Sequence, residues 1–325
     1  MSEVFNWTED GHNVGVHYNH QLSRKLLEIA LPKCLVNQFV HDHGVGFKKR
    51  AGETINIMHM TELPDANIDG LGEDDQFRID KPAFGNRPVT LQQYGSGVEW
   101  SELMDILSVW GPFENEFQKK LRIQMENALD TLAANAFKDS TAALVVFTPT
   151  SRVGGVWAVN GTPATLASSA LTIDHCQKIS QYMRNVIHTP FYSDETYCGL
   201  SSNTNIESLL SDPRAEKWQQ YGAKMDFMYR GEMCLTYKIR WTETNRQGAF
   251  ADTTGNCSAL GESVVFGDEA VGRIEALAPH LRLSSNYQGR FATKQAAIWY
   301  AVMKYFSVWA SSSDGKAKII RIASA

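Results

Sequence analysis

Residues 113–138, FENEFQKKLRIQMENALDTLAANAFK, decide the fold of this chain. Apolar residues recur in this stretch in steps of three or four, which is the spacing of one face of an α-helix. They are Phe113, Phe117, Leu121, Met125, Ala128, Leu132 and Ala136. Pro112 suits the first turn of such a helix, and Glu114 and Lys138 complement the helix dipole at its two ends. The pattern predicts a helix about 39 Å long, enough to cross a whole domain.

Two strands are predicted upstream of this helix, joined by a long polar stretch. Residues 54–57 alternate between polar and apolar within 48–60, and Val89 and Leu91 alternate within 87–98. Between these strands, residues 62–86 contain seven acidic residues together with several glycines and prolines. A connection of this length is unusual inside a compact domain. We therefore expect a long hairpin that reaches away from the body of the protein.

The rest of the chain reads as a mixture of helices and strands, which indicates an α+β fold. Helices are expected over 101–107, 172–187 and 205–210, and over 21–39, where Pro32 opposes continuation past Ala30. Strands are expected over 142–148, 197–200, 224–243 and 264–266, with loops over 150–165 and 244–262. A helical turn is expected over 268–274, and 299–310 is expected to pair with 317–322 as a terminal strand pair.

Composition excludes several classes of protein. The 325 residues include 31 basic and 36 acidic side chains, a net charge of −5, with both signs spread along the chain. This balance predicts neither the basic surface that binds duplex DNA tightly nor a polybasic patch for membranes. No apolar run approaches the ~20 residues that span a bilayer, and the polar N-terminus does not resemble a secretory signal. We expect synthesis in the cytoplasm and no membrane partner.

The cysteines do not form a disulfide framework. The chain has five, an odd number, and no CxxC pair. They are Cys34, Cys176, Cys198, Cys234 and Cys257. We expect free thiols.

Few residues point to catalysis or metal binding, and each has a simpler structural interpretation. His41-Asp42-His43, with further histidines at 12, 17 and 20, has the residue types of a zinc or iron site, but no second ligand pair follows at a recognisable spacing. Neighbouring residues diverge around a helix, so Asp174-His175-Cys176 cannot form a dyad. Cys176 or Cys198 would need an activating base that the sequence does not reveal. Core or surface roles are preferred for all of them.

Three other patterns also have simpler structural interpretations. The acidic run 73–75 has carboxylates for calcium, although a solvated loop is the commoner meaning of such a run. The aromatic residues of 299–309 are able to stack on bases, but core packing is preferred. Gly95-Ser96-Gly97 lacks the third glycine of a dinucleotide fingerprint, because Trp100 occupies that place, and is expected to serve a hairpin or a helix start.

The order of the predicted elements resembles a known family. LSRKLLEIALPK is followed by KKRAGETINIMHMTEL, by KPAFGNRPVTLQQYGSGVEWSELMDIL and by the long helix, and later by TNIESLLSDPRAEKWQQYG and SVVFGDEAVGRIEAL. This ordered set, from about Leu22 to Arg321, resembles the major capsid proteins of tailed bacteriophages, in particular those of N-four-like podoviruses. No single motif in it is diagnostic.

The resemblance implies the Hong Kong 97-type capsid fold. In that fold, residues 1–40 would form an N-terminal arm with the first helix, and 41–98 an extended hairpin, the E-loop. Residues 99–150 would belong to a peripheral domain whose spine helix is 113–138. Residues 151–262 would be mainly an axial domain, and 263–325 would return to the axial and peripheral sheets.

The resemblance also implies function and partners. The subunit would assemble into hexamers and pentamers of an icosahedral head that encloses double-stranded DNA, contacted only non-specifically. A separate scaffolding protein, a portal and a decoration protein would be the candidate partners, and the mature location would be the virion. No catalytic, cofactor-binding or metal-binding residue is expected. The alternatives are a metal-dependent enzyme that uses the His41/His43 region, a cysteine enzyme, or a monomeric nucleic-acid-binding protein.

Overall fold

The computed structural model describes the elements of the fold and the turns that join several of them. The described residues are 34–43, 54–60, 63, 76, 79–82, 84–101, 114–138, 143–147, 155–158, 170–185, 187–213, 232–246, 248–250, 261–288, 292–308 and 318–324. The predicted helices over 101–107 and most of 21–39 lie outside these ranges, as does most of the stretch 62–83. Within 21–39, only a short 3-10 helix, η2 (Val36–Phe39), is described.

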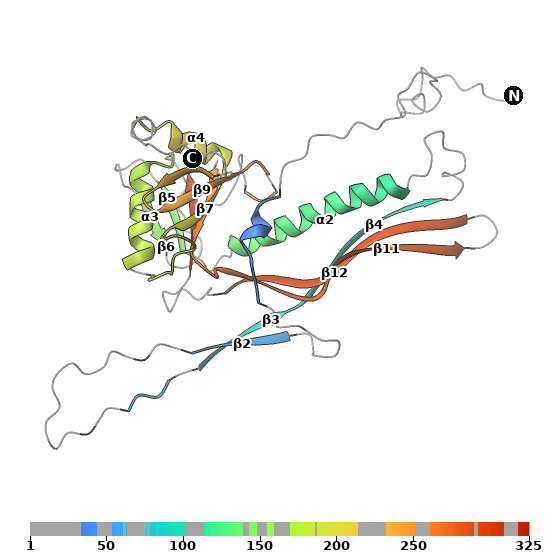
Figure 1. Ribbon diagram of the computed structural model, residues 1–325, viewed down its shortest axis with the longest axis horizontal. Coiled ribbons are helices and arrows are strands. Elements are labelled where there is room, and N and C mark those ends of the chain that lie inside the picture. The colour runs from blue at the N-terminus through green and yellow to red at the C-terminus, as the bar shows by residue number, and fades with distance from the viewer. Residues whose placement is uncertain are drawn as a thin grey trace.

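The long helix predicted from the apolar spacing is confirmed as α2 (Glu114–Phe137). It lies along one sheet and ends beside the other (Figure 1). Leu121 is 1% exposed, but most of the predicted stripe is only half-buried. The most deeply buried positions near the C-terminal end are Ala133, Ala134 and Phe137. Burial is therefore broader there than a single stripe, because the helix enters the region between the two sheets.

A four-stranded sheet lies against α2, in the order β1-β11-β12-β4. Its strands are β1 (His41–Asp42), β11 (Val271–Gln288), β12 (Ala292–Ser307) and β4 (Gln92–Ser101). The expectation of a helical turn over 268–274 is wrong, because β11 begins at Val271 after a turn at Asp268 and Glu269. The register of β11 against β12 shifts twice between Glu275 and His280, which interrupts the strict alternation of a strand.

The second sheet has seven strands in the order β6-β5-β13-β10-β7-β9-β8. They are β5 (Ala143–Phe147), β6 (Gly155–Ala158), β7 (Tyr197–Ser202), β8 (Glu232–Thr236), β9 (Ile239–Thr244), β10 (Gly261–Phe266) and β13 (Ile319–Ser324). Helices α3 (Ile173–Asn185) and α4 (Asn203–Leu210) contribute apolar side chains to this sheet's core. The predicted strands at 142–148, 197–200 and 264–266 are confirmed, and so are the helices beginning near 172 and 205.

Two further expectations about strands are wrong. The predicted loop 150–165 contains β6, which pairs antiparallel with β5. The predicted terminal pair does not form, because β12 pairs with β11 and β4 while β13 lies in the other sheet between β10 and β5. Both errors concern pairing between segments, which a local apolar pattern does not encode.

A separate two-stranded hairpin projects from the body (Figure 1). Its strands are β2 (Thr54–Met60) and β3 (Phe84–Thr90), paired antiparallel from Thr54↔Thr90 to Met60↔Phe84. This confirms a strand within 48–60 and its antiparallel pairing with the stretch around Val89, but the single strand predicted over 87–98 is divided at Leu91 between β3 and β4, which lie in different sheets. The chain then continues through Leu91 into β4, so the hairpin is joined directly to the sheet that carries α2.

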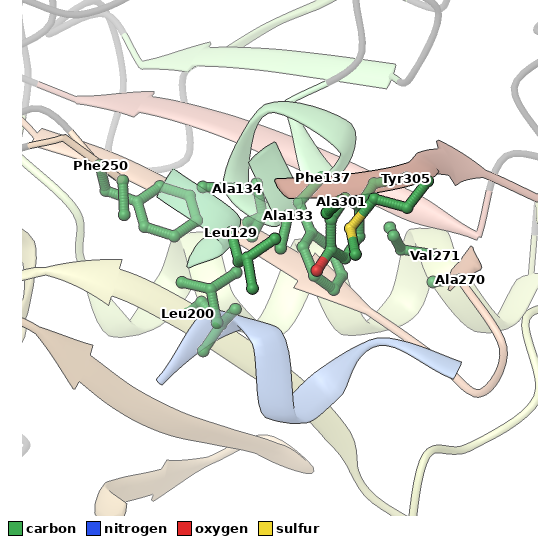
Figure 2. Packing of buried hydrophobic residues seen from close by; sticks show 14 of the residues in the cluster. Leu129, Ala133, Ala134, Phe137, Leu200, Phe250, Ala270, Val271, Ala301 and Tyr305 are labelled. Atoms are coloured by element: carbon green, nitrogen blue, oxygen red, sulfur yellow. The ribbon is translucent and has the colours of Figure 1, made fainter. Parts of the chain in front are cut away.

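The main core lies where α2, η2 and the two sheets meet. Figure 2 shows Leu129, Ala133 and Phe137 of α2 beside Leu200 of β7 and Ala301 of β12. Phe137 and Phe266 have ring centroids 4.6 Å apart. Because β7 and β10 belong to the seven-stranded sheet and β12 to the other, this cluster holds the two sheets together.

Candidate functional site: the projecting hairpin and its anchorage

One face of the hairpin carries exposed apolar side chains. Met58, Met60 and Phe84 are 76%, 59% and 72% exposed, and Met60 is directly opposite Phe84 in the register. Side chains two apart on a strand lie on the same face, so these three form one apolar surface, which we call the hairpin face. Ile79 is 86% exposed and Leu63 is 55% exposed in the adjoining segment. An exposed apolar cluster of this kind is typical of an interaction surface.

The opposite face of the hairpin is anchored to the body. Val89 is 4% exposed and packs in a small core cluster with Ile274 of β11 and Phe306 of β12. Ile55 and Ile57, which alternate with the exposed face, are half-buried against the same cluster. The base of the hairpin therefore packs against the body. At its far end, the described part of the chain leaves the apolar side chains exposed.

A buried ion pair links α2 to the seven-stranded sheet in the body of the protein that supports the hairpin. Asp130 of α2 is fully buried, and its Oδ2 lies 3.1 Å from Nη1 of Arg246, which follows β9. Arg246 also donates to Oγ1 of Thr131 at 2.6 Å and to the backbone carbonyl of Asn127. A buried charge needs such partners, because the protein interior does not replace its hydration. The pair ties α2 to the seven-stranded sheet.

The Asp130 carboxylate also accepts a hydrogen bond from η2, which precedes the hairpin in the chain. The backbone N–H of Asn37 donates to Oδ1 of Asp130 at 3.2 Å. Tyr305 of β12 donates its hydroxyl to Oδ1 of Asn37 at 2.9 Å, and burial raises the pKa of Tyr305 to about 12. The phenol therefore remains a donor at all physiological pH values. Burial, followed by the Asp130 charge, also raises the pKa of the Cys34 thiol, which keeps that thiol protonated.

A second polar joint lies at the C-terminal end of α2. Nζ of Lys138 is 3.3 Å from Oε2 of Glu262 in β10, and Nη1 of Arg321 in β13 donates to the Lys138 carbonyl at 3.5 Å. Cations near the last carbonyls of a helix are favourable for its dipole. This joint fixes the end of α2 against the centre of the seven-stranded sheet.

The histidines with the residue types of a metal site, His41 and His43, lie at the contact between β1 and β11. His41 and Asp42 form β1, and Asp42 pairs with Arg273 at 3.2 Å. The rings of His41 and His43 are 5.2 Å apart, while His43 lies 5.6 Å from the ring of Phe306. Burial, and next the His41 charge, lower the pKa of His43. No group of three or more His, Cys, Asp or Glu side chains suited to a metal occurs in the part of the chain described here.

The other candidate residues lie apart from one another or in the core. His175 and Cys176 are buried in the first turn of α3, where Nδ1 of His175 lies 3.2 Å from the backbone nitrogen of Thr172. Cys198 is 4% exposed in β7, so neither thiol is accessible for attack on a substrate. His12, His17, His20, the acidic run 73–75, Cys257 and Trp309 lie outside the described residues.

Three of the four aromatic residues of β12 are core residues, as preferred from the sequence, while Tyr300 is half-buried. Trp299, Tyr305 and Phe306 are each 5% exposed or less. The glycine pair has a different role from the one expected, since Gly95 and Gly97 lie inside β4 against β12. A Cβ at Gly95 would lie 2.8 Å from the carbonyl oxygen of Trp299. These glycines permit close approach of two strands, and they serve neither a hairpin nor a helix start.

Sequence reasoning missed the Asp130–Arg246 pair. The available signal was an acidic residue beside the apolar stripe of a long helix, next to Leu129. Its partner is 116 positions away in a stretch expected to be a loop. Without a pattern that links the two positions, the sequence could not show that the carboxylate is buried.

This architecture defines the class of fold. No protein-family model matches the chain, and no curated protein matches it. The fold matches solved structures of phage capsids over nearly the whole chain, which confirms the predicted α+β, Hong Kong 97-type capsid fold. Within the described residues, no helix is long and apolar enough to cross a membrane.

Three particular structures illustrate the likeness. The capsid chain of Cyanophage Pam1 has a TM-score of 0.68 and 12% identity, covering 98% of this chain and 99% of that chain. The capsid of Cyanophage P-SCSP1u has a TM-score of 0.67 and 11% identity, with 97% and 95% covered. The head structure of Helicobacter pylori bacteriophage KHP40 has a TM-score of 0.66 and 11% identity, with 100% and 99% covered. At these identities the likeness establishes the fold.

Proposed function

We propose that this chain is a major capsid protein of a tailed bacteriophage, which assembles into hexamers and pentamers of an icosahedral head around double-stranded DNA. The observation that carries the proposal is the end-to-end likeness to phage capsid chains, with 94% or more of this chain covered in each comparison. The apolar hairpin face supports it independently, because a projecting strand pair with uncovered apolar side chains needs a second molecule.

The domain division predicted from the sequence is part of the proposal. Residues 1–40 would be the arm, 41–98 the extended hairpin, 99–150 the peripheral domain with the spine helix, 151–262 mainly the axial domain, and 263–325 the return. Packing of α2 on β12 and β11 supports placing the spine helix and the long strand pair together. The cluster around Val89 supports a hairpin hinged on that same sheet.

The finer assignments rest on the sequence resemblance. The lineage would be that of N-four-like podoviruses, with a separate scaffolding protein, a portal and a decoration protein as candidate partners. The protein would be made in the host cytoplasm and reside in the virion, with no catalytic activity and no bound cofactor or metal. The geometry of the described candidate residues does not favour the metal-enzyme or cysteine-enzyme alternatives.

The direct test is assembly of the purified protein. We expect hexamers, pentamers or closed shells by light scattering and negative-stain electron microscopy, alone or with its scaffolding protein. A monomer under all conditions, with scaffold included, would refute the proposal. Metal analysis of the same preparation tests the enzyme alternative, since stoichiometric zinc or iron that is lost on joint replacement of His41 and His43 by Ala would favour it.

A matched variant tests the role of the hairpin. Replacement of 62–86 by a short Gly-Ser turn should leave a soluble subunit of nearly unchanged helicity, because the supported base of the hairpin lies at Val89 and Ile55, outside the deletion. The same protein should not form closed shells. Circular dichroism and electron microscopy on one preparation separate these outcomes. Normal shells from the variant would remove the assembly role, and global unfolding would place the segment in the subunit core.

A further inference from the structure

The charge of the chain is concentrated in one segment. Residues 62–86 contain seven acidic and two basic residues, so their net charge of −5 equals that of the whole chain. The other 300 residues carry 29 charges of each sign and are neutral overall. A neighbour that neutralises this segment must therefore offer a local basic site, since the remainder of the chain has no general positive charge.

A cleft of about 440 Å³ in the body offers such a local basic site. It lies between the C-terminal end of α2 and the adjacent ends of β4 and β12, and its lining includes two lysines and no acidic residue. Lys304 and Lys138 provide the charge, while Leu132 and Ala136 provide apolar surface. The acidic segment has the same mixture of chemistry, with apolar side chains such as Ile79, 86% exposed, among its carboxylates.

Lys304 is the better placed of the two ammonium groups. Lys138 already pairs with Glu262. Nζ of Lys304 lies 2.9 Å from Oε1 of Gln92, which also accepts a hydrogen bond of 2.6 Å from the hydroxyl of Tyr94. A neutral amide orients the ammonium without neutralising it. The lysine is thus held at the cleft with its charge available for a carboxylate.

We propose that this cleft receives the acidic segment 62–80 of a neighbouring copy, with Lys304 as the principal charge partner. The inference rests on the proposed capsid function and identifies where the hairpin of one subunit binds the next. The contact is heterologous, because a segment of one copy fills a different surface of another. Repetition of a heterologous contact closes into a ring when the rotation permits.

A second copy is the appropriate source of the segment. The register places Met60 and Phe84 at the hairpin end that adjoins the acidic segment, and Thr90 at the end next to Gln92 of the cleft. Six strand steps separate Phe84 from Thr90, a distance of about 20 Å. This exceeds the Debye length of about 8 Å at physiological salt, so the attraction within one copy is screened. The hairpin leaves the body in the opposite direction from α2 (Figure 1).

Carbodiimide coupling of assembled particles tests the contact directly. The reagent joins a lysine amine to a contacting carboxylate as an amide, with loss of water. Particles are built from an equal mixture of ¹⁴N- and ¹⁵N-labelled full-length chains, coupled and digested for mass spectrometry. We expect peptides that contain Lys304 joined to a carboxylate of 62–80, with mixed labels in about half of them, as random mixing of two copies requires.

The same sample contains its own control. Nζ of Lys238 lies 3.3 Å from Oε2 of Glu195 within one chain, so that coupled product must carry a single label. Formation of the Lys238–Glu195 product without any mixed-label Lys304 product would overturn the inference while leaving the capsid function intact. Failure of the wild-type chain to assemble would instead refute the proposed function, and the inference with it.

Charge reversal gives a second, independent measurement. Lys304→Glu should lower the yield of shells at least tenfold, whereas Lys119→Glu, on an exposed part of α2 paired with Glu116, should change it less than twofold. Combining Lys304→Glu with Glu73→Lys, Asp74→Lys and Asp75→Lys should restore assembly. Equal yields from the two single variants, or no rescue from a folded combined variant, would contradict the role of Lys304.

Discussion

Asp130 and Phe84 represent two regions of the molecule that differ in how their side chains are buried and partnered. Asp130 is a fully buried charge, yet Arg246 and the backbone N–H of Asn37 satisfy its two oxygens. Phe84 is apolar and 72% exposed, and the described part of its own chain leaves it uncovered. The charged groups at the junction around α2 are therefore satisfied within one subunit, whereas we propose that a neighbouring subunit covers the hairpin face. Changes in the first region should alter folding, and changes in the second should alter assembly.

The largest effect on folding is expected from Leu121→Asp. Leu121 is 1% exposed in the middle of α2, so the variant would bury an unpaired carboxylate at a cost of several kcal/mol. We expect inclusion bodies or a much lower urea midpoint. Gln124→Asp, on an exposed position of the same helix, is the control and should remain soluble. An unchanged melting temperature for Leu121→Asp would show that this face of α2 is not part of the core.

The next largest effect is expected at the buried ion pair. Arg246→Met leaves the Asp130 carboxylate buried without its cation and should lower the free energy of unfolding by about 3–5 kcal/mol. The double variant Asp130→Leu/Arg246→Met removes both charges and should be more stable than Arg246→Met alone. Urea unfolding of the unassembled subunit measures both. A single variant as stable as wild type would mean that the pair does not join α2 to the seven-stranded sheet.

A smaller, pH-dependent effect is expected at His43. Its pKa is lowered in the folded protein by burial and by His41, against opposing contributions from Glu269 and Asp42, with Lys318 also lowering it. Below about pH 6.5 the unfolded chain binds a proton that the folded protein resists, so folding stability falls as the pH decreases. His43→Gln should flatten the decline in the urea midpoint between pH 7.5 and 5.5. A steeper decline in that variant would contradict the direction of the shift.

The smallest effect on folding, with the greatest contrast in assembly, is expected on the hairpin face. Replacement of Met58, Met60 and Phe84 together by Ser should change the free energy of unfolding by no more than about 0.5 kcal/mol per site, because all three are exposed. Shells should be lost. Val89→Ser on the other face of the same hairpin should destabilise the subunit by about 2 kcal/mol, since that side chain is 4% exposed. Assembly by the triple variant would separate these apolar side chains from the interface.

Local patterns in the sequence predicted the elements that depend on neighbours along the chain. The steps of four from Phe117 to Met125 predicted α2, and alternation around Ile55 and Val89 predicted the hairpin strands. In β11, Val271, Ile274, Leu277 and Leu281 fall at helical spacing. Two register shifts against β12 break the alternation that would have revealed a strand. Pairing along its length with β12 outweighs the local pattern.

Local patterns could not predict which strands, far apart in the sequence, pair with one another. Nothing near Ile319 indicates that β13 pairs with β5 and β10 in preference to β12, because strand partners are chosen by the assembled core. The cleft lysines were also missed for this reason. Lys304 lies in an aromatic strand, and its contact with Gln92 spans 212 positions.

The central position of β13 has a consequence for the order of events during synthesis. β5 and β10 lie on either side of β13, so the two parts of the seven-stranded sheet cannot join until residues 319–324 have left the ribosome. At about 5–20 residues per second, β5 waits roughly 10–35 s for its neighbour after it has been made. During that interval the open edge of β5 is available to other strands. We expect nascent chains arrested before Ile319 to be digested readily by protease, so that a truncated chain is removed before it can enter a shell.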